Sequence, residues 1–329
     1  MIEIKNLNKS YGNHLAVKNL SIDIEPGRIY GFLGPNGAGK STTMNIITGC
    51  IAASSGSVTV CGHDIFKNSA AAKSCIGYLP EQPPLYTDMT VYEYLDFVGE
   101  AKKIKKKERI IQIKDIMEQT ALTQVRDRLI GNLSKGYKQR VGIAQAILGY
   151  PPVIIFDEPT VGLDPKQIHI VRNLIRSLKE NHTVVLSSHI MQEIAAVCDY
   201  IIVISEGEIV ANDTPEGLVN SYADKVSVSL KVKGSKEESE EVIKNAEGIL
   251  KISYEENKST EFSVFCLEID ENQNADDVCE NLFFAFSKAD IPINEMKVNR
   301  MGLEDIFIKL TSKKYEPEAY ESAELGQQE

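Results

Sequence analysis

Hydrophobic and polar positions between Ile2 and about Leu218 form short strand-like runs separated by longer helical stretches. The first segments, IEIKNLNKSYG and SIDIEPG, alternate apolar with polar residues, as an exposed antiparallel portion does. Later runs are continuously apolar, which is typical of strands covered on both faces; they are Tyr30–Leu33, Val153–Phe156, Val184–Ser187 and Ile201–Ile204. The pattern predicts an α/β fold rather than a helical bundle.

Two other segments depart from this pattern. Between Thr90 and Asn132 the spacing becomes helical, which predicts a helical subdomain at about residues 90–135, inserted in a first domain of residues 1–220. After Pro215 the composition shifts, and residues 221–312 predict a small α+β accessory domain that fits a ferredoxin-like topology. Its expected strands are 226–232, 262–269 and 294–298, and its expected helices are 237–245, 275–285 and 303–310. The acidic tail, residues 313–329, lacks apolar periodicity and is expected to be disordered.

Composition narrows the class of protein. The chain has 329 residues, 43% of them hydrophobic and 25% charged, close to the averages for globular domains. Its apolar runs are far shorter than the ~20 residues of a transmembrane helix, and its first residues lack the layout of a signal peptide, so a cytoplasmic location is expected. The cysteines form no C-x-x-C pair, which disfavours a zinc site or a disulfide framework. A net charge of −11 disfavours nucleic acid as a partner.

The strongest motif is a P-loop pattern between the strand-like YGFL and a helical stretch. Glycines in such a loop let backbone N–H groups approach phosphates, and the following helix N-terminus favours an anion. Lys40 is expected to reach the β and γ phosphates, and Ser41 to bind Mg²⁺. The pattern predicts a nucleoside triphosphate site, with the expected nucleotide-binding residues Gly34, Pro35, Asn36, Gly37, Ala38, Gly39, Lys40, Ser41 and Thr42.

A pair of acids ends the apolar run Val153–Phe156. This arrangement is that of a Walker B motif, in which the first acid, Asp157, belongs to the Mg²⁺ shell. Glu158 is then placed to accept a proton from the water that attacks the γ-phosphate, or to orient that water. Two acids at a strand end can also be solvated turn residues, but the P-loop favours the interpretation as a hydrolytic site.

From Ile2 to about Leu218 the chain resembles the nucleotide-binding domain of ABC transporters, because its motifs occur in that family's order. Tyr11 resembles the aromatic residue that stacks on adenine, and Leu133–Tyr137 (LSKGY) resembles the family signature. Gly162-Leu163-Asp164 resembles the D-loop, in which Asp164 is a nucleotide-site residue, and His189 resembles the catalytic switch histidine. Taken singly, Tyr11 is more often a packed aromatic and His189 an ordinary strand-end histidine, so both depend on their place in the series.

The chain departs from the usual family pattern at two places. Lys135 and Tyr137 stand where many members have Gly and Gln, whereas Ser134 and Gly136 are kept. In the family, residues at these two positions contact the γ-phosphate held by the opposing subunit. In the segment GYLPEQ, the flanks place Glu81 at the usual Q-loop glutamine and Gln82 one residue later, so either residue is a candidate for approaching Mg²⁺.

The resemblance implies an ATPase that pairs head-to-tail, with a second copy or a paralogous ATPase subunit, around two ATP molecules and Mg²⁺. It also implies a separate membrane-spanning permease that holds the subunit at the inner face of the cell membrane. The segments LSKGYKQR, VGLDPKQI and Gly302–Phe307 resemble the subfamily that drives type-2 exporters, which favours export.

Two other functions, and one other interpretation of a charged surface segment, are alternatives to this prediction. A soluble ABC ATPase acting on ribosomes usually has two ATPase domains, and one acting on DNA usually has a long coiled-coil insertion; neither is visible here. A non-hydrolysing regulatory subunit would be expected to lose Glu158 or His189, and both are present. The lysine-rich run of residues 102–107 fits a solvated helix end better than contact with an anionic membrane.

Overall fold

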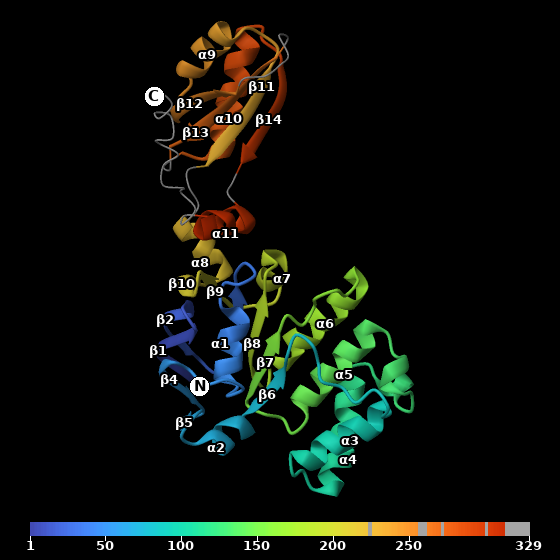
Figure 1. The fold of residues 1–329 in the computed structure, drawn as a ribbon. Coiled ribbons are helices and arrows are strands. Elements are labelled where there is room, and N and C mark those ends of the chain that lie inside the picture. Colours follow the sequence, from blue (N-terminus) through green and yellow to red (C-terminus); the bar gives the residue numbers. More distant parts are fainter. Residues whose placement is uncertain (223–225, 256–261, 271–272, 300–301, 313–329) are drawn as a thin grey trace, which may run out of the picture. The chain divides into compact units, whose positions relative to one another are not determined.

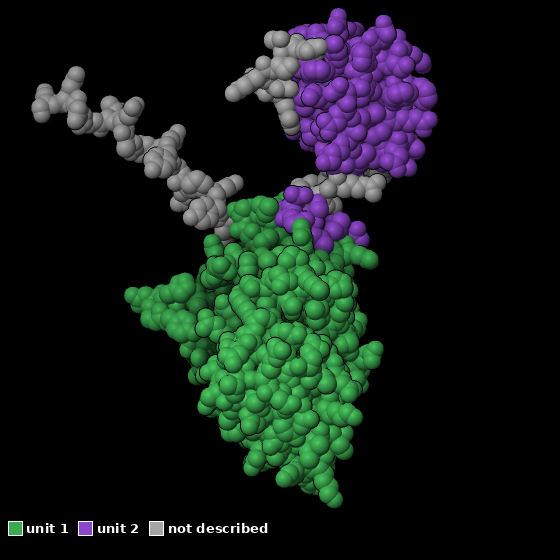
Figure 2. All heavy atoms as spheres, turned by 90° about the vertical axis from the view of Figure 1, so that its right-hand side faces the viewer, with its two compact units in different colours: residues 1–216, 307–329 green, residues 217–306 purple. Residues whose placement is uncertain are grey.

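The computed structural model comprises residues 1–222, 226–255, 262–270, 273–299 and 302–312. The chain divides into two compact units, Met1–Glu216 with Phe307–Glu329 and Gly217–Ile306 (Figure 2). This division falls within the helices α8 (Pro215–Tyr222) and α11 (Leu303–Ser312), whereas the sequence analysis placed the boundaries at residues 220 and 312. The predicted disordered tail, residues 313–329, lies outside the described residues.

The first unit contains a six-stranded sheet with the order β10-β9-β3-β8-β7-β6 (Figure 1). Five of these strands run parallel, and β10 pairs antiparallel at the edge. Strands β3, β7 and β8 are buried along their whole length, which explains why most of their residues are apolar. The strands are β3 (Ile29–Leu33), β6 (Ile76–Leu79), β7 (Val153–Asp157), β8 (Thr183–Ser188), β9 (Tyr200–Ser205) and β10 (Glu208–Asp213).

A second, antiparallel sheet of the first unit has the order β2-β1-β4-β5. Along β2, buried and exposed residues alternate, as the amphipathic pattern predicted. One hydrophobic cluster joins the two sheets, with Ile4 and Val58 from this sheet and Phe32 and Ile155 from the parallel one. The strands are β1 (Ile2–Tyr11), β2 (His14–Ile24), β4 (Ser55–Val60) and β5 (His63–Asp64).

Helices complete the first unit, and those of the predicted helical segment lie together beside the sheet (Figure 1). The first of these, α3, starts with a capping box in which Thr90 and Glu93 each accept a hydrogen bond from the other's backbone N–H. The described residues contain no helix that is both long and apolar enough to cross a bilayer. The remaining helices and 3₁₀ turns are α1 (Lys40–Ile47), α2 (Ser69–Ser74), α3 (Val91–Ala101), α4 (Lys106–Gln119), η1 (Thr123–Val125), η2 (Ile130–Asn132), α5 (Lys135–Ile147), α6 (Pro165–Leu178) and α7 (Met191–Ala195).

The second unit is a βαββαβ arrangement with an antiparallel sheet of order β12-β13-β11-β14, the ferredoxin-like topology that the sequence suggested. Alternate residues of β11 and β13 pack with Leu282 and Phe286 in one core. The sequence analysis missed strand β12, which lies at the edge of the sheet. The elements are β11 (Ser227–Val232), α9 (Lys236–Lys244), β12 (Ile249–Glu255), β13 (Ser263–Ile269), α10 (Ala275–Lys288) and β14 (Ile293–Asn299).

Candidate nucleotide site

The loop between β3 and α1 contains the predicted phosphate-binding residues, and Lys40 is the first residue of α1. Gly37 and Gly39 have φ angles of 81° and 103°, in the left-handed region that favours glycine. At Gly39 a Cβ atom would also lie 2.6 Å from the carbonyl oxygen of Ala16. Only glycine at position 39 allows the loop to approach Ala16 so closely. The loop backbone leads directly into the N-terminus of α1, which favours anions.

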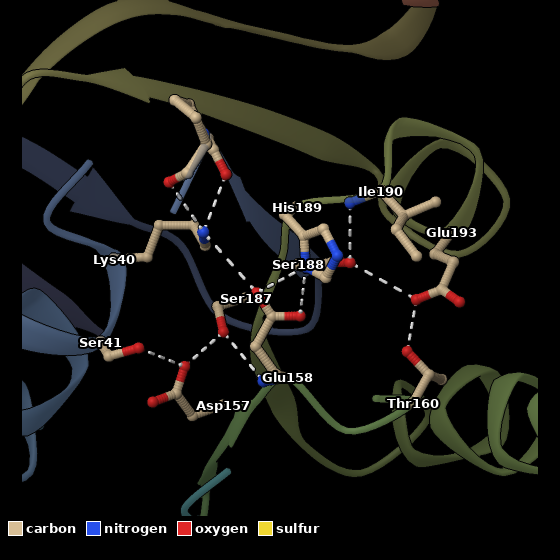
Figure 3. Close-up of polar contacts among 12 residues, drawn as sticks. Lys40, Ser41, Asp157, Glu158, Thr160, Ser187, Ser188, His189, Ile190 and Glu193 are labelled. Carbon is tan, nitrogen blue, oxygen red and sulfur yellow. Dashed lines mark hydrogen bonds and ion pairs between the residues drawn. The ribbon is translucent and has the colours of Figure 1, made fainter. Parts of the chain in front are cut away.

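Lys40 is held at the loop by oxygen atoms. Its side chain is 5% exposed. The ammonium donates hydrogen bonds to the carbonyl oxygens of Gly34 at 2.8 Å and Pro35 at 3.2 Å, and it lies 3.6 Å from Glu158 Oε1 (Figure 3). The carbonyls and the carboxylate hold the ammonium in a place that an anionic phosphate can reach.

Glu158 follows the end of β7 in a strained backbone conformation. Its φ is 48°, which is uncommon for a residue other than glycine. Its backbone N–H donates to Ser187 Oγ at 2.9 Å, and its carboxylate oxygens lie 3.1 and 3.2 Å from His189 Nδ1. Glu158 is thus fixed between a lysine and a histidine (Figure 3), an arrangement that suits a carboxylate that orients or deprotonates a water molecule.

Asp157, the last residue of β7, supplies the candidate metal-binding group. Its Oδ1 accepts hydrogen bonds from Ser187 Oγ at 2.5 Å and from Ser41 Oγ at 3.1 Å. One carboxylate and one hydroxyl, both hard oxygen donors, fit Mg²⁺, which usually takes few protein ligands and completes its shell with phosphates and water. No group of three or more His, Cys, Asp or Glu side chains suited to a metal occurs in the described part of the chain.

A cleft of about 530 Å³ connects these groups. Tyr11 lies at its wall with half of its surface exposed, and the ammonium of Lys9 lies 5.0 Å from the centroid of its ring. Glu81 lines the cleft and Gln82 does not, so Glu81 is the better placed of the two Q-loop candidates. The cleft is lined by the predicted Tyr11, Asn36, Gly37, Gly39, Lys40, Ser41, Thr42, Glu81, Glu158 and His189, and by His14, Ala16 and Val161, which the sequence analysis missed.

The predicted signature residues do not line this cleft. Ser134 is the exposed N-cap of α5, and Asp164 caps α6 by accepting a hydrogen bond from the backbone N–H of Gln167 at 2.9 Å. A Cβ atom at Gly136 would lie 2.7 Å from the Gln167 side chain, so the signature and the D-loop region pack against each other. The structure therefore separates Ser134, Gly136 and Asp164 from the P-loop of the same chain.

The two residues that depart from the family signature have partners nearby. The Tyr137 hydroxyl accepts a hydrogen bond from Gln124 Nε2 at 2.9 Å, and the Arg140 guanidinium lies 4.2 Å from the ring centroid of Tyr137. The hydrogen bond with Gln124 and the charge of Arg140 lower the pKa of Tyr137. Lys135 lies against Gly162, because a Cβ atom there would be 2.0 Å from its Nζ. The side chains of Lys135 and Tyr137 are thus held by residues other than Ser134 and Gly136.

The structure adds Ser187 to the site. This serine bonds the Asp157 carboxylate and the Glu158 backbone, and it faces Asp157 in the register of β7 and β8. Its sequence signal was the polar end of the apolar run Val184–Ser187, because parallel strands bring their carboxyl ends to one edge of the sheet.

Comparison with known proteins identifies the family. The family model for ABC transporters matches residues 17–161. Linearmycin resistance ATP-binding protein LnrL of Bacillus subtilis is 36% identical over 238 residues, which span 72% of this chain and 76% of that protein. Bacitracin transport ATP-binding protein BcrA of Bacillus licheniformis is 40% identical over 211 residues, spanning 64% of this chain and 68% of that one. ABC transporter A family member 1 of Dictyostelium discoideum is 36% identical, and the chain spans only 25% of its length.

Solved structures agree with this assignment. A dimeric ATP-binding cassette in a post-hydrolysis state with ADP and phosphate superposes with a TM-score of 0.60 at 27% identity, and the match covers 65% of this chain and 98% of that one. The shared fold, the P-loop cleft and the similar sequences lead to one conclusion. The chain belongs to the ABC transporter family, as an ATP-binding and ATP-hydrolysing subunit that resembles those of type-2 exporters.

Proposed function

We propose that the chain powers a separate membrane-spanning permease, in the direction of export, by hydrolysing ATP in the cleft around Lys40 and Glu158. The observation that carries this proposal is the buried contact of Glu158 with both Lys40, at 3.6 Å, and His189, at 3.1 Å. A subunit that only bound nucleotide would have no need of a carboxylate held beside the phosphate-binding loop. Export is supported by the name of a similar protein, Nod factor export ATP-binding protein I of Cupriavidus metallidurans, which is 32% identical over 222 residues.

In the proposed reaction Glu158 accepts a proton from a water molecule. The oxygen of that water bonds to the γ-phosphorus as the bond from the γ-phosphorus to the leaving ADP oxygen breaks, which yields ADP and phosphate. His189 holds the Glu158 carboxylate through its Nδ1, and Lys40 faces the negative charge of the β and γ phosphates. The strained backbone of Glu158 is consistent with a side chain that must point in one direction.

Binding is assigned to the remaining residues of the cleft. The loop of residues 34–42 surrounds the phosphates, with backbone N–H groups from residues other than Pro35, which has none. The exposed ring of Tyr11 stacks on the adenine. Ser41 and Asp157 would hold Mg²⁺, and Glu81, which also lines the cleft, is the Q-loop residue that would approach it. When bound, Mg²⁺ neutralises charge on the β and γ phosphates.

The separation of Ser134 and Gly136 from the P-loop cleft supports a dimer. An exposed helix N-terminus at Ser134 is suited to a phosphate but lines no part of this chain's cleft. In a head-to-tail pair the signature of each subunit, with Asp164 nearby, meets the ATP of the other, so two ATP molecules lie between the subunits. The second subunit is another copy or a paralogous ATPase subunit. ATP then favours the closed pair, and hydrolysis loosens it.

The proposed location of the chain is the cytoplasmic face of the cell membrane, where the permease holds the ATPase pair. The test is affinity purification of the tagged chain from detergent-solubilised membranes of its native host, with ATPase activity measured on what co-elutes. A matched preparation of Lys40→Ala controls for contaminating ATPases. Recovery of a polytopic membrane protein together with activity that Lys40→Ala lacks is the expected result. Recovery of ribosomes or of DNA-bound proteins instead would contradict the proposal.

A further inference from the structure

A buried carboxylate outside the predicted site, Glu193 of α7, lies between the two loops that carry the hydrolytic residues. Its side chain is 6% exposed. Glu193 Oε2 accepts a hydrogen bond from Thr160 Oγ1 and another from Ser188 Oγ, the latter at 3.4 Å (Figure 3). Within the described residues no cation pairs with it, so these hydroxyl groups are what satisfies the carboxylate. A carboxylate is costly to bury in this way and adds nothing to the hydrophobic core.

Each hydroxyl belongs to a segment that positions one partner of the Glu158–His189 contact. Thr160 follows Glu158 by two residues, and its carbonyl oxygen accepts from the backbone N–H of Leu163 at 3.2 Å, which starts the D-loop turn. Ser188 directly precedes His189, and its hydroxyl also accepts from the backbone N–H of Ile190 at 3.1 Å. The bonds around Ser188 thus fix the backbone on both sides of His189.

Together these bonds close a ring. One arm runs from Glu193 through Thr160 to Glu158, the other runs through Ser188 to His189, and the ring closes where His189 Nδ1 meets the Glu158 carboxylate at 3.1 Å. A displacement of either arm moves the backbone that carries Glu158 or His189 and so changes the distance across the closing bond. The arm through Thr160 is continuous with the D-loop, so the ring connects the D-loop to His189 through Glu193.

We infer that Glu193 is a positioning residue for ATP hydrolysis, which sets the distance between Glu158 and His189 and couples it to the position of the D-loop. This inference rests on the proposed hydrolytic role of Glu158. Glu193 touches neither the cleft nor its lining residues of the P-loop, so it acts on turnover and leaves nucleotide binding alone.

The experiment compares Glu193→Gln, Thr160→Val and the double variant in the complete chain with its co-purified permease. Loss of a hydrogen bond to a charged group predicts a fall in kcat of about ten- to a hundredfold for each single variant, with KM for ATP changed less than about twofold. Thr160→Val breaks the bond between residues 160 and 193, and Glu193→Gln keeps an acceptor oxygen there but removes its charge. Because both substitutions act on one bond, the double variant should be no slower than the slower single variant. Gln192→Ala, on the exposed side of α7, is the matched control and should keep full activity.

Folding is checked separately by combining Glu193→Gln with Glu158→Gln, which should still form an ATP-bound dimer. If Glu193→Gln prevents folding, Thr160→Val, Ser188→Ala and their double variant take its place, because they leave the carboxylate in position. Their kcat and KM for ATP are then compared in the same way. An unchanged kcat, equal changes in kcat and KM, or additive losses would overturn the positioning role. If Glu158→Gln abolishes turnover while Glu193→Gln does not alter it, only this inference fails; if Glu158→Gln keeps full turnover, the proposed hydrolytic role fails as well.

Discussion

The buried ion pair between Lys40 and Glu158 makes a prediction about stability as well as activity. The two side chains are 5% and 8% exposed, and the distance from Nζ to Oε1 is 3.6 Å. At an effective dielectric constant of about 20, opposite charges at this distance attract by about 5 kcal/mol, part of which is cancelled by desolvation. Lys40→Ala leaves the Glu158 carboxylate without its cation. We expect this substitution to lower the free energy of unfolding by about 3 kcal/mol in the absence of nucleotide.

A double-variant cycle isolates the pair. Glu158→Gln removes the unpaired charge, so Lys40→Ala/Glu158→Gln should be more stable than the sum of the single losses predicts, by about 1–3 kcal/mol. A loss of about 3 kcal/mol corresponds to a melting temperature about 6–12 °C lower for a unit of this size. The chain contains no tryptophan, so circular dichroism is the suitable probe of unfolding.

Nucleotide binding is measured on the same samples with a fluorescent ATP analogue. The double variant should recover stability but not nucleotide affinity, because the cation that faces the phosphates is still absent. Losses of stability that add within about 0.5 kcal/mol would show that the two charges do not interact and would refute the reasoning.

Three further predictions concern other parts of the first unit. Asp157→Asn should weaken Mg²⁺ binding, so that half-maximal ATP turnover needs a higher Mg²⁺ concentration, while bonds to the serine hydroxyls keep the fold. A Mg²⁺ titration identical to that of the unsubstituted chain would contradict the assigned metal site. Gly77→Ala should lower the melting temperature, because a Cβ atom at Gly77 would lie 2.1 Å from the carbonyl oxygen of Ala146, and an unchanged melt would contradict that contact. Burial, with a smaller contribution from Tyr86, raises the pKa of Tyr94 to about 12. Since an unfolded tyrosine ionises at about pH 10, stability should fall as the pH rises from about 10 to 12, and Tyr94→Phe should reduce this fall in pH-dependent melts.

The sequence predicted the strands that are buried on both faces, because a short, continuously apolar run such as Val153–Phe156 is typical of a central strand in an α/β chain. It did not reveal β12, since an edge strand is half exposed and its mixture of apolar and polar residues resembles a loop. The P-loop was recognisable because glycine at positive φ and a lysine at a helix start are local requirements.

Contacts between distant segments were not predictable. The sequence left Glu81 and Gln82 open because they are adjacent in an exposed loop, and only the backbone path decides which one meets the cleft. Lys102 looked like part of a solvated lysine run, yet its ammonium donates to the carbonyl oxygens of Gln145 at 2.8 Å and Leu148 at 2.6 Å, at the end of α5. The pairing of Thr160 with Glu193 likewise depends on the packing of α7, on which sequence spacing gives no information.

Glu158→Gln is the most direct test of whether Glu158 carries out hydrolysis between two ATP-bound subunits. ATPase activity is measured on the variant purified with its permease. Dimer formation by the ATPase chain in the presence of ATP and Mg²⁺ is followed separately by light scattering. We expect ATP binding to be kept, turnover to be lost and a stable ATP-bound dimer to accumulate. Full turnover in the variant, or ATP binding without any dimer, would contradict it.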